Sequence, residues 1–195
     1  MYKARDVAYI GILAALNSVS EVFIGGSLYI LGFYFKGTIM IGINLLLYVI
    51  TREMVNKRGD VLAVAFITAF LRFAFLGQLS AALGIFIEGI IVEVVFDILR
   101  ADSKGCIVAG ALANTWTLFH PFLIGIYILG PERVLIYNKV ASYLIQKGYS
   151  GALFLGLFYP LSGAMLGFII IKAVSLFKKR KVILVRENNV TLTPK

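Results

Sequence analysis

The sequence has very few of the residues on which secreted domains and many soluble enzymes depend. It holds one cysteine, one histidine and four prolines in 195 residues, and only 15% of its residues are charged. A single cysteine excludes an intramolecular disulfide, and we expect Cys106 to be a small buried hydrophobe. The lone histidine and the lack of an HExxH pair argue against a metal centre. No metal ion or other cofactor is expected.

Catalytic and nucleotide-binding motifs are missing as well. The sequence contains no GxSxG motif and no plausible arrangement of Ser, His and Asp for nucleophilic catalysis. It also lacks a GxxxxGK[ST] loop, so any ATP hydrolysis linked to this chain must belong to partner proteins. These absences favour a binding protein over an enzyme.

Hydrophobic residues dominate what is there. They make up 60% of the chain and give a mean hydropathy of +0.91, values that are typical of an integral membrane protein. A helical span needs about 20 mostly apolar residues. The sequence therefore predicts an all-α membrane protein, with one six-helix domain over residues 1–180 and a short, frayed cytoplasmic tail over residues 181–195. The six predicted spans are Val7–Phe23, Gly37–Ile50, Val61–Leu76, Leu79–Leu99, Cys106–Leu129 and Gly151–Val174.

Three boundaries need comment. The first run is longer than the apolar region of a signal peptide and lacks a small-residue cleavage site, so we interpret it as a retained span. The second run is short, and Leu28–Phe35 can extend it across Lys36 as a tilted or re-entrant segment. The polar stretch Glu132–Lys147 is either an interfacial helix or an outward extension of the sixth span.

The net charge of +9 is unevenly distributed along the chain. Most basic residues flank the spans on one side of the predicted membrane, the arrangement that the positive-inside rule gives when both termini are cytoplasmic. Nucleic-acid binding is not expected, because a soluble domain and basic residues interleaved with aromatics are both missing. A secondary role for Lys178–Lys181 in binding anionic lipid headgroups remains open. The residues on the basic side are Lys3, Arg5, Arg52, Lys57, Arg58, Arg100, Lys104, Lys172 and Lys178–Lys181.

Three carboxylates lie within the fourth predicted span, Leu79–Leu99. A charged side chain at membrane depth costs roughly 2.5–3.5 kcal/mol even on insertion scales, so it usually faces a cavity or a partner. Glu88 falls about nine residues, or roughly 13 Å, below the outer surface. Glu93 lies near the middle, about 140° away around the helix, and is a candidate either for substrate binding or for orienting the helix. Asp97 lies near the cytoplasmic end, where pairing with Arg100 explains it.

Other polar and aromatic residues fall in the outer halves of the remaining spans. Trp116 and His120 are four residues apart and share a helical face, as do Asn17 and Glu21. Arg72 lies at a depth similar to Glu88, so these two residues are candidates for a structural ion pair. Such groups suit a small, polar, ring-shaped ligand, because aromatic walls stack and a desolvated carboxylate attracts a cation. The candidate substrate-binding residues are Glu88, Trp116, His120, Asn114, Tyr159, Glu93 and Arg72.

A ridge of small residues follows the first span. It consists of Ala4, Ala8, Gly11 and Ala15, with Ile12 interrupting a continuous alanine row. Small residues at four-residue spacing let another helix approach closely. Packing within the chain and docking of a separate membrane subunit both explain the pattern. The small residues of the sixth span, Ser162, Gly163 and Gly167, are expected to serve internal packing.

These features resemble a known family of membrane proteins. Six spans in about 200 residues, a basic cytoplasmic side and the small-residue ridge are similar to the substrate-binding S component of an energy-coupling factor (ECF) transporter. The motif Glu88-Gly89-x-x-x-Glu93-x-Val95-Phe96, ending at Arg100, resembles the thiamine and hydroxymethylpyrimidine branch of the family. So does Ser162-Gly163-Ala164-x-Leu166.

The resemblance implies a division of labour between subunits. The S component would capture a vitamin or vitamin precursor from outside a prokaryotic plasma membrane. A transmembrane coupling protein and two cytoplasmic ATPases would then drive its release inward. In such proteins the ridge on the first span meets the coupling protein. Glu88 would contact an aminopyrimidine or offset a cation, with Trp116 and Tyr159 as stacking partners.

Two other functional classes remain open at this stage. A self-contained transporter of small solutes that works as a homodimer is the first alternative, and an intramembrane enzyme or structural membrane protein is the second. Co-purification with a coupling protein and ATPases favours the S component. Unaided transport by the reconstituted chain favours the homodimer.

Overall fold

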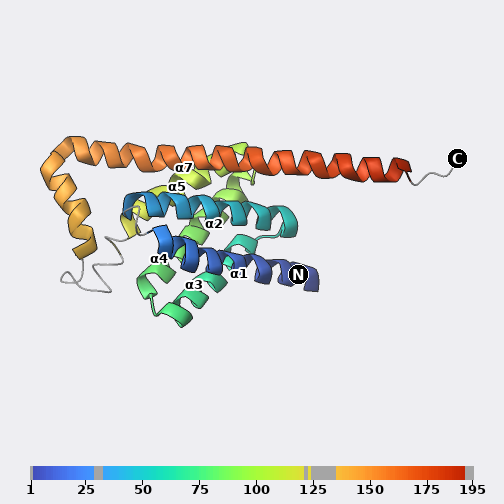
Figure 1. The fold of residues 1–195 in the computed structure, drawn as a ribbon, viewed down its shortest axis with the longest axis horizontal. Coiled ribbons are helices and arrows are strands. Elements are labelled where there is room, and N and C mark those ends of the chain that lie inside the picture. The colour runs from blue at the N-terminus through green and yellow to red at the C-terminus, as the bar shows by residue number, and fades with distance from the viewer. Residues whose placement is uncertain (1, 29–32, 121–122, 124–134, 192–195) are drawn as a thin grey trace.

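The described part of the chain is entirely helical. The computed structural model describes residues 2–28, 33–120, 123 and 135–191, and these form six helices. The helices are α1 (Ala4–Ser27), α2 (Phe33–Val55), α3 (Asp60–Leu76), α4 (Leu79–Leu99), α5 (Ser103–His120) and α7 (Leu135–Thr191). Figure 1 shows them as one bundle, with α7 running along its edge.

Four of the helical segments are long and apolar enough to cross a membrane. They are Ala4–Gly25, Lys36–Val55, Leu79–Leu99 and Gln146–Phe177. Neither α3, which has 17 residues, nor the described part of α5 is among them. The sequence predicted six spans. The all-helical fold is confirmed for the described residues, and four of the six helices have the length and composition of membrane spans.

Two of the six predicted spans match their helices closely. The fourth predicted span coincides with α4, and the third differs from α3 by one residue. The second run extends across Lys36 as one continuous helix from Phe33. The fifth prediction continues to Leu129, but most residues beyond His120 lie outside the described part of the chain.

For the last helix the structure favours one of the two alternatives left open for Glu132–Lys147, a helix separate from the sixth span, and it differs from expectation in the tail. The backbone of α7 breaks at Gly148 (φ 56°, ψ −136°), so the segment from Leu135 to Lys147 forms a separate leg that turns away from the sixth span, as Figure 1 shows. The predicted frayed tail is instead helical as far as Thr191. The reason is local, because no glycine or proline interrupts the sequence from Phe168 to Thr191.

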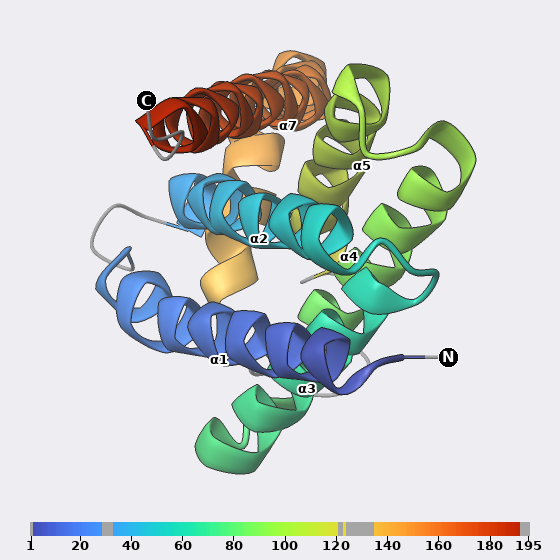
Figure 2. The same ribbon diagram turned by 90° about the vertical axis from the view of Figure 1, so that its right-hand side faces the viewer.

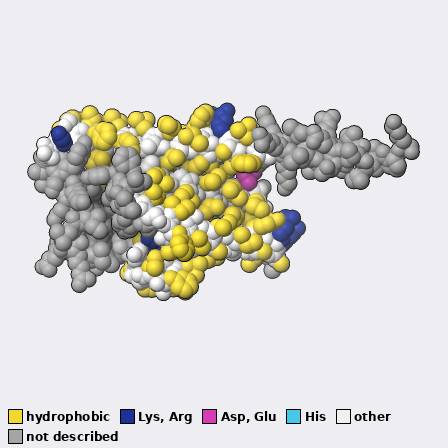
Figure 3. All heavy atoms as spheres, viewed as in Figure 1, with side chains coloured by type: hydrophobic (Ala, Val, Ile, Leu, Met, Phe, Trp, Pro, Cys, Tyr) yellow, Lys and Arg dark blue, Asp and Glu magenta, His cyan; other side chains and the backbone are white. Residues whose placement is uncertain are grey.

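Figure 2 shows α2 near the middle of the bundle, between α1 and α7. The core surrounds this helix, and its residues Leu45, Tyr48 and Val49 have no exposed surface. Large hydrophobic side chains such as Phe70 and Leu161 instead lie on the outside. Figure 3 shows such side chains covering most of the described part of one face. An apolar exterior around a core that also holds polar groups is expected for a bundle in lipid.

Glycines bring the backbones of α5 and α7 into direct contact. A Cβ on Gly163 would collide with the carbonyl oxygen of Gly110, and a Cβ on Gly167 would collide with that of Cys106. This confirms that the small residues of the sixth span serve internal packing. Cys106 itself is completely buried at this contact, as predicted.

The bundle has two ends with different chemistry. We call the end with the final turn of α2, the first turn of α3 and the final turn of α4 the Arg52 end. The opposite end, with the final turn of α5, is the His120 end. Short polar turns connect α2 to α3 and α4 to α5 at the Arg52 end.

Candidate functional site

Glu88 lies in the interior of the bundle, on the face of α4 that meets α2. Its side chain is almost completely buried, with 5% of the residue exposed. The Asn44 amide nitrogen donates to Glu88 Oε2 at 3.3 Å and also to Glu21 Oε1 of α1 at 3.1 Å. One amide group therefore bridges two carboxylates that come from different helices.

Arg72 neutralises Glu21 and does not contact Glu88. Its Nη1 donates to Glu21 Oε2 at 3.0 Å and to the Glu21 carbonyl oxygen at 2.7 Å, while Nη2 donates to Gln78 Oε1 at 3.0 Å. The Arg72–Glu88 ion pair that the sequence allowed is therefore wrong. Arg72 and Glu88 lie at similar depths, but the Arg72 guanidinium pairs with Glu21 of α1 instead.

Several buried polar atoms around Glu88 have no partner. We define the Glu88 cluster as the six polar residues that gather between α1, α2, α3 and α4. Among the described residues, no hydrogen bond reaches Glu88 Oε1, Asn44 Oδ1 or Asn17 Oδ1, and the Tyr48 hydroxyl lies beside the Asn17 side chain. Buried polar groups are normally paired, so this number in one place indicates a ligand or solvent site. The cluster consists of Asn17, Glu21, Asn44, Tyr48, Arg72 and Glu88.

Trp116 and His120 lie together one helical turn from Glu88. Their ring centroids are 6.1 Å apart, which confirms their shared face. The Trp116 indole donates to the Gly84 carbonyl oxygen at 3.0 Å, and a Cβ on Gly84 would come within 2.9 Å of the His120 ring. Gly84 precedes Glu88 by four residues, so this aromatic pair borders the same side of α4.

Asn114 and Tyr159 belong to a third group, which joins α5 to α7. The Asn114 amide donates to the Tyr159 carbonyl oxygen at 2.8 Å and to the Ser162 hydroxyl at 2.9 Å. It also reaches the Thr38 hydroxyl of α2 at 3.3 Å. These bonds hold the two helices together, but Asn114 Oδ1 has no partner within the described chain.

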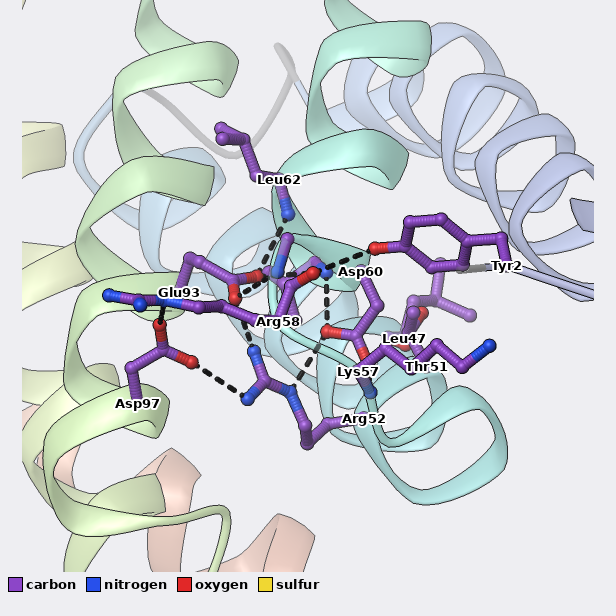
Figure 4. A network of polar contacts seen from close by, with 12 residues as sticks. Tyr2, Leu47, Thr51, Arg52, Lys57, Arg58, Asp60, Leu62, Glu93 and Asp97 are labelled. Carbon is purple, nitrogen blue, oxygen red and sulfur yellow. Dashed lines mark hydrogen bonds and ion pairs between the residues drawn. The ribbon is translucent and has the colours of Figure 1, made fainter. Parts of the chain in front are cut away.

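Glu93 lies outside the Glu88 cluster, at the Arg52 end (Figure 4). Its carboxylate accepts hydrogen bonds from the backbone N–H groups of Gly59, Val61 and Leu62 at 2.7–3.1 Å. These groups begin α3, and Gly59 has no side chain that can cap them. Glu93 is thus a cap supplied by a different helix, which agrees with a helix-orienting role and places it away from the other candidate binding residues.

Arg52 completes this network, as Figure 4 shows. It donates to Asp60 at 2.9 Å, to Asp97 at 3.0 Å and to Glu93 at 2.5 Å. Asp97 also accepts from Arg58 at 2.8 Å, so the predicted pairing of Asp97 with Arg100 is wrong. The physical reason is that α4 ends at Leu99, and Arg100 leaves the helical path with φ at 64°.

The ridge on α1 faces outward. Ala4, Ala8, Gly11 and Ala15 are all exposed, and a Cβ on Gly11 would meet no atom within 4 Å. The opposite face of α1 packs against α2 and α3. Packing within the described chain therefore does not account for the small residues, and the ridge is available to lipid or to another helix.

Sequence reasoning missed two members of the cluster, Asn44 and Tyr48. The available signal was Asn44 itself, an amide in the middle of an apolar run. Tyr48 follows it by four residues and so shares its face. Asn17 and Glu21 had been paired on one face, but the sequence did not show that this face turns toward Glu88.

Two further hollows lie apart from Glu88. A polar pocket of about 390 Å³ at the Arg52 end is lined by residues that include Arg52, Phe96 and Arg100. An apolar groove of about 320 Å³ lies between α1 and α3. Neither is lined by Glu88, although Arg72, a member of the Glu88 cluster, lines the apolar groove.

Comparison with known proteins adds no relative. No protein-family model, no curated protein and no solved structure matches the chain. Its fold and site together define an all-helical protein with four helices suited to membrane spanning and a buried polar cluster beside an aromatic pair. Any narrower identity rests on the residues themselves.

Proposed function

We propose that this chain is the substrate-binding S component of an ECF-type importer. It captures a small vitamin-like molecule, of the thiamine or hydroxymethylpyrimidine kind, on the outer side of a prokaryotic plasma membrane. A coupling protein and two ATPase subunits then provide the energy for its release inward. The proposal names no cofactor and no catalytic step.

Glu88 is the observation on which the proposal mainly rests. Its carboxylate is buried among apolar helices, and no Lys or Arg of the described chain forms an ion pair with it. One of its two oxygens lacks a hydrogen-bond partner among the same residues. Such a group is costly in a membrane unless it binds something, and a cationic or amino-bearing ligand offers both charge and donors. The Trp116–His120 pair, one turn away, supplies flat surfaces on which a ring can stack.

The proposed membrane orientation follows from charge. All six helices cross or enter the bilayer, and both termini are cytoplasmic because most Lys and Arg residues lie at the Arg52 end. Glu88 then lies nearer the outer surface than Glu93 does. The His120 end is then the side from which the ligand enters.

The exposed ridge on α1 supports a partner in the membrane. Ala4, Ala8, Gly11 and Ala15 leave a shallow strip on a helix that otherwise carries large exposed hydrophobic residues such as Val19 and Phe23. A shallow strip of this kind permits close helix–helix contact. We assign this strip to the coupling protein.

Native mass spectrometry of the mildly purified protein tests the ligand. We expect a bound molecule with the mass of thiamine or a pyrimidine precursor. Glu88→Gln should weaken its binding by about 1.5–3 kcal/mol, or roughly 10- to 150-fold, if a charge-assisted hydrogen bond is lost. Glu53→Gln is the matched control, because Glu53 is an exposed residue at the Arg52 end of α2. Equal affinity in wild type and Glu88→Gln would remove Glu88 from the binding site.

Purification from the native membrane tests the partners. An S component should co-purify with one membrane protein and two ATPases. Reconstituted chain that moves its substrate without these partners would instead support the homodimeric transporter. Loss of turnover without loss of binding in Glu88→Gln and His120→Ala would support an enzyme.

A further inference from the structure

The Glu88 cluster contains more unpaired oxygen atoms than one ligand contact explains. Glu88 Oε1, Asn44 Oδ1 and Asn17 Oδ1 lack hydrogen-bond partners within the described residues, and the Tyr48 hydroxyl lies beside the Asn17 side chain. Each of the four residues is at least nine-tenths buried. They come from three helices, α1, α2 and α4, so their gathering depends on the tertiary fold.

Their proximity follows from the contacts of Asn44. The Asn44 amide nitrogen bridges Glu21 and Glu88, which orients its oxygen as a remaining acceptor. Helices α1 and α2 run in opposite directions. Asn17 lies one turn before Glu21 on α1, and Tyr48 lies one turn after Asn44 on α2, so Asn17 and Tyr48 come to lie opposite each other. The Tyr48 hydroxyl is also 3.8 Å from the position of a Cβ on Gly89, next to Glu88.

The charges of the cluster leave Glu88 uncompensated. Arg72 forms an ion pair with Glu21 at 3.0 Å. The Lys36 side chain also lies on the Glu21 side of the cluster, because its Cε and Glu21 Oε2 both approach the position of a Cβ on Gly25. Glu88 has no ion pair in the described chain, and its one hydrogen bond comes from a neutral amide.

We propose that the Glu88 cluster binds a monovalent metal cation of the Na⁺ class. Carboxylate, amide and hydroxyl oxygens are the ligands that hard cations prefer. A single charge matches the single unpaired carboxylate, and a divalent ion would leave excess positive charge in the membrane interior. The cation site shares Glu88 with the proposed vitamin site, but cation binding is measurable without an organic ligand.

Thermal unfolding in defined salts tests this site. Cys106 is completely buried, so a dye that fluoresces on reaction with thiols reports unfolding. The purified protein, without organic ligand, is titrated with NaCl while N-methylglucamine chloride keeps ionic strength constant, and KCl and LiCl series compare ion sizes. We expect a saturable rise in the unfolding midpoint with at least one of the three metal cations.

Tyr48→Phe is the variant and Tyr9→Phe its matched control. Each removes one hydroxyl group, but Tyr9 lies outside the cluster on a partly exposed part of α1. Tyr48→Phe should raise the cation concentration needed for half-maximal stabilisation by about tenfold, as loss of a group around a metal site commonly does. Tyr9→Phe should behave as wild type. If Tyr48→Phe does not fold, Glu88→Gln replaces it and should abolish the cation dependence.

Two results would overturn the proposal. One is an unfolding midpoint that none of the metal cations shifts relative to N-methylglucamine, which would mean that the cluster holds water or a proton. The other is an equal cation response in wild type and Glu88→Gln. Because no vitamin is present in these measurements, either result leaves the proposed function untouched, and a failure to bind vitamin leaves the cation site untouched.

Discussion

Replacing Glu93 by Gln should destabilise the bundle far more than the same replacement at Glu88. The two glutamates lie five residues apart on α4, and both are at least nine-tenths buried. Glu93 accepts three backbone hydrogen bonds from the start of α3 and one ion pair from Arg52. Glu88 accepts one hydrogen bond, from Asn44, which a Gln oxygen can also accept.

The magnitude follows from the bonds at each position. A buried donor left without a partner costs about 1–3 kcal/mol, and breaking a buried ion pair costs about 3–5 kcal/mol. In Glu93→Gln the glutamine side chain keeps one acceptor oxygen, and Arg52 keeps its ion pairs with Asp60 and Asp97. The loss in free energy of unfolding is therefore smaller than the sum of these two costs. We expect Glu93→Gln to cost about 3 kcal/mol, or about 6–12 °C in the unfolding midpoint. Glu88→Gln should change the midpoint by less than about 2 °C, since its single hydrogen bond is kept.

The Cys106 dye assay measures both variants under identical conditions, in N-methylglucamine chloride so that no metal cation stabilises Glu88. Binding of the ligand provides the second measurement. Glu88→Gln should lose affinity and keep its stability, whereas Glu93→Gln should lose stability first. Equal midpoints for the two variants would refute the capping role of Glu93.

Three further predictions concern helix contacts. Gly163→Ala places a methyl group against a backbone oxygen of α5, so it should lower the unfolding midpoint by several degrees, whereas Gly156→Ala meets open space and should not. Gly11→Leu should spare ligand binding and abolish ATP-driven uptake in vesicles that hold all subunits, and unchanged uptake would exclude the ridge from coupling. Trp116→Phe removes the hydrogen bond to the Gly84 carbonyl oxygen. It should weaken ligand binding about three- to tenfold, as measured by calorimetry. A larger loss of stability than of affinity would assign Trp116 to packing alone.

The helical fold was predictable because hydropathy reports spans directly. The bounds of α4 followed from one apolar run, broken only by three carboxylates, between two turns. The break at Gly148 was less visible, since a glycine inside a helical pattern indicates neither a break nor its direction. The helical continuation to Thr191 differs from the frayed tail that a position at the end of the sequence suggests, because no residue in that segment stops a helix.

The candidate site was only partly predictable. Periodicity correctly placed Trp116 and His120 on one face, because that relation lies within a single helix. The partners of Arg72 and Asp97 were wrong, because ion pairs between helices depend on rotation and depth, which hydropathy does not specify. For the same reason the sequence did not reveal that Asn44 bridges two carboxylates.

The cap on α3 also constrains how the protein is made. Residues of α2 and α3 leave the ribosome before Glu93 and Asp97, so Arg52 and the first N–H groups of α3 enter the membrane region before two of the three carboxylates of the network exist. The first three helices therefore lack two of the acidic partners at the Arg52 end until α4 has been made. Synthesis of α4 is then the step that completes this network.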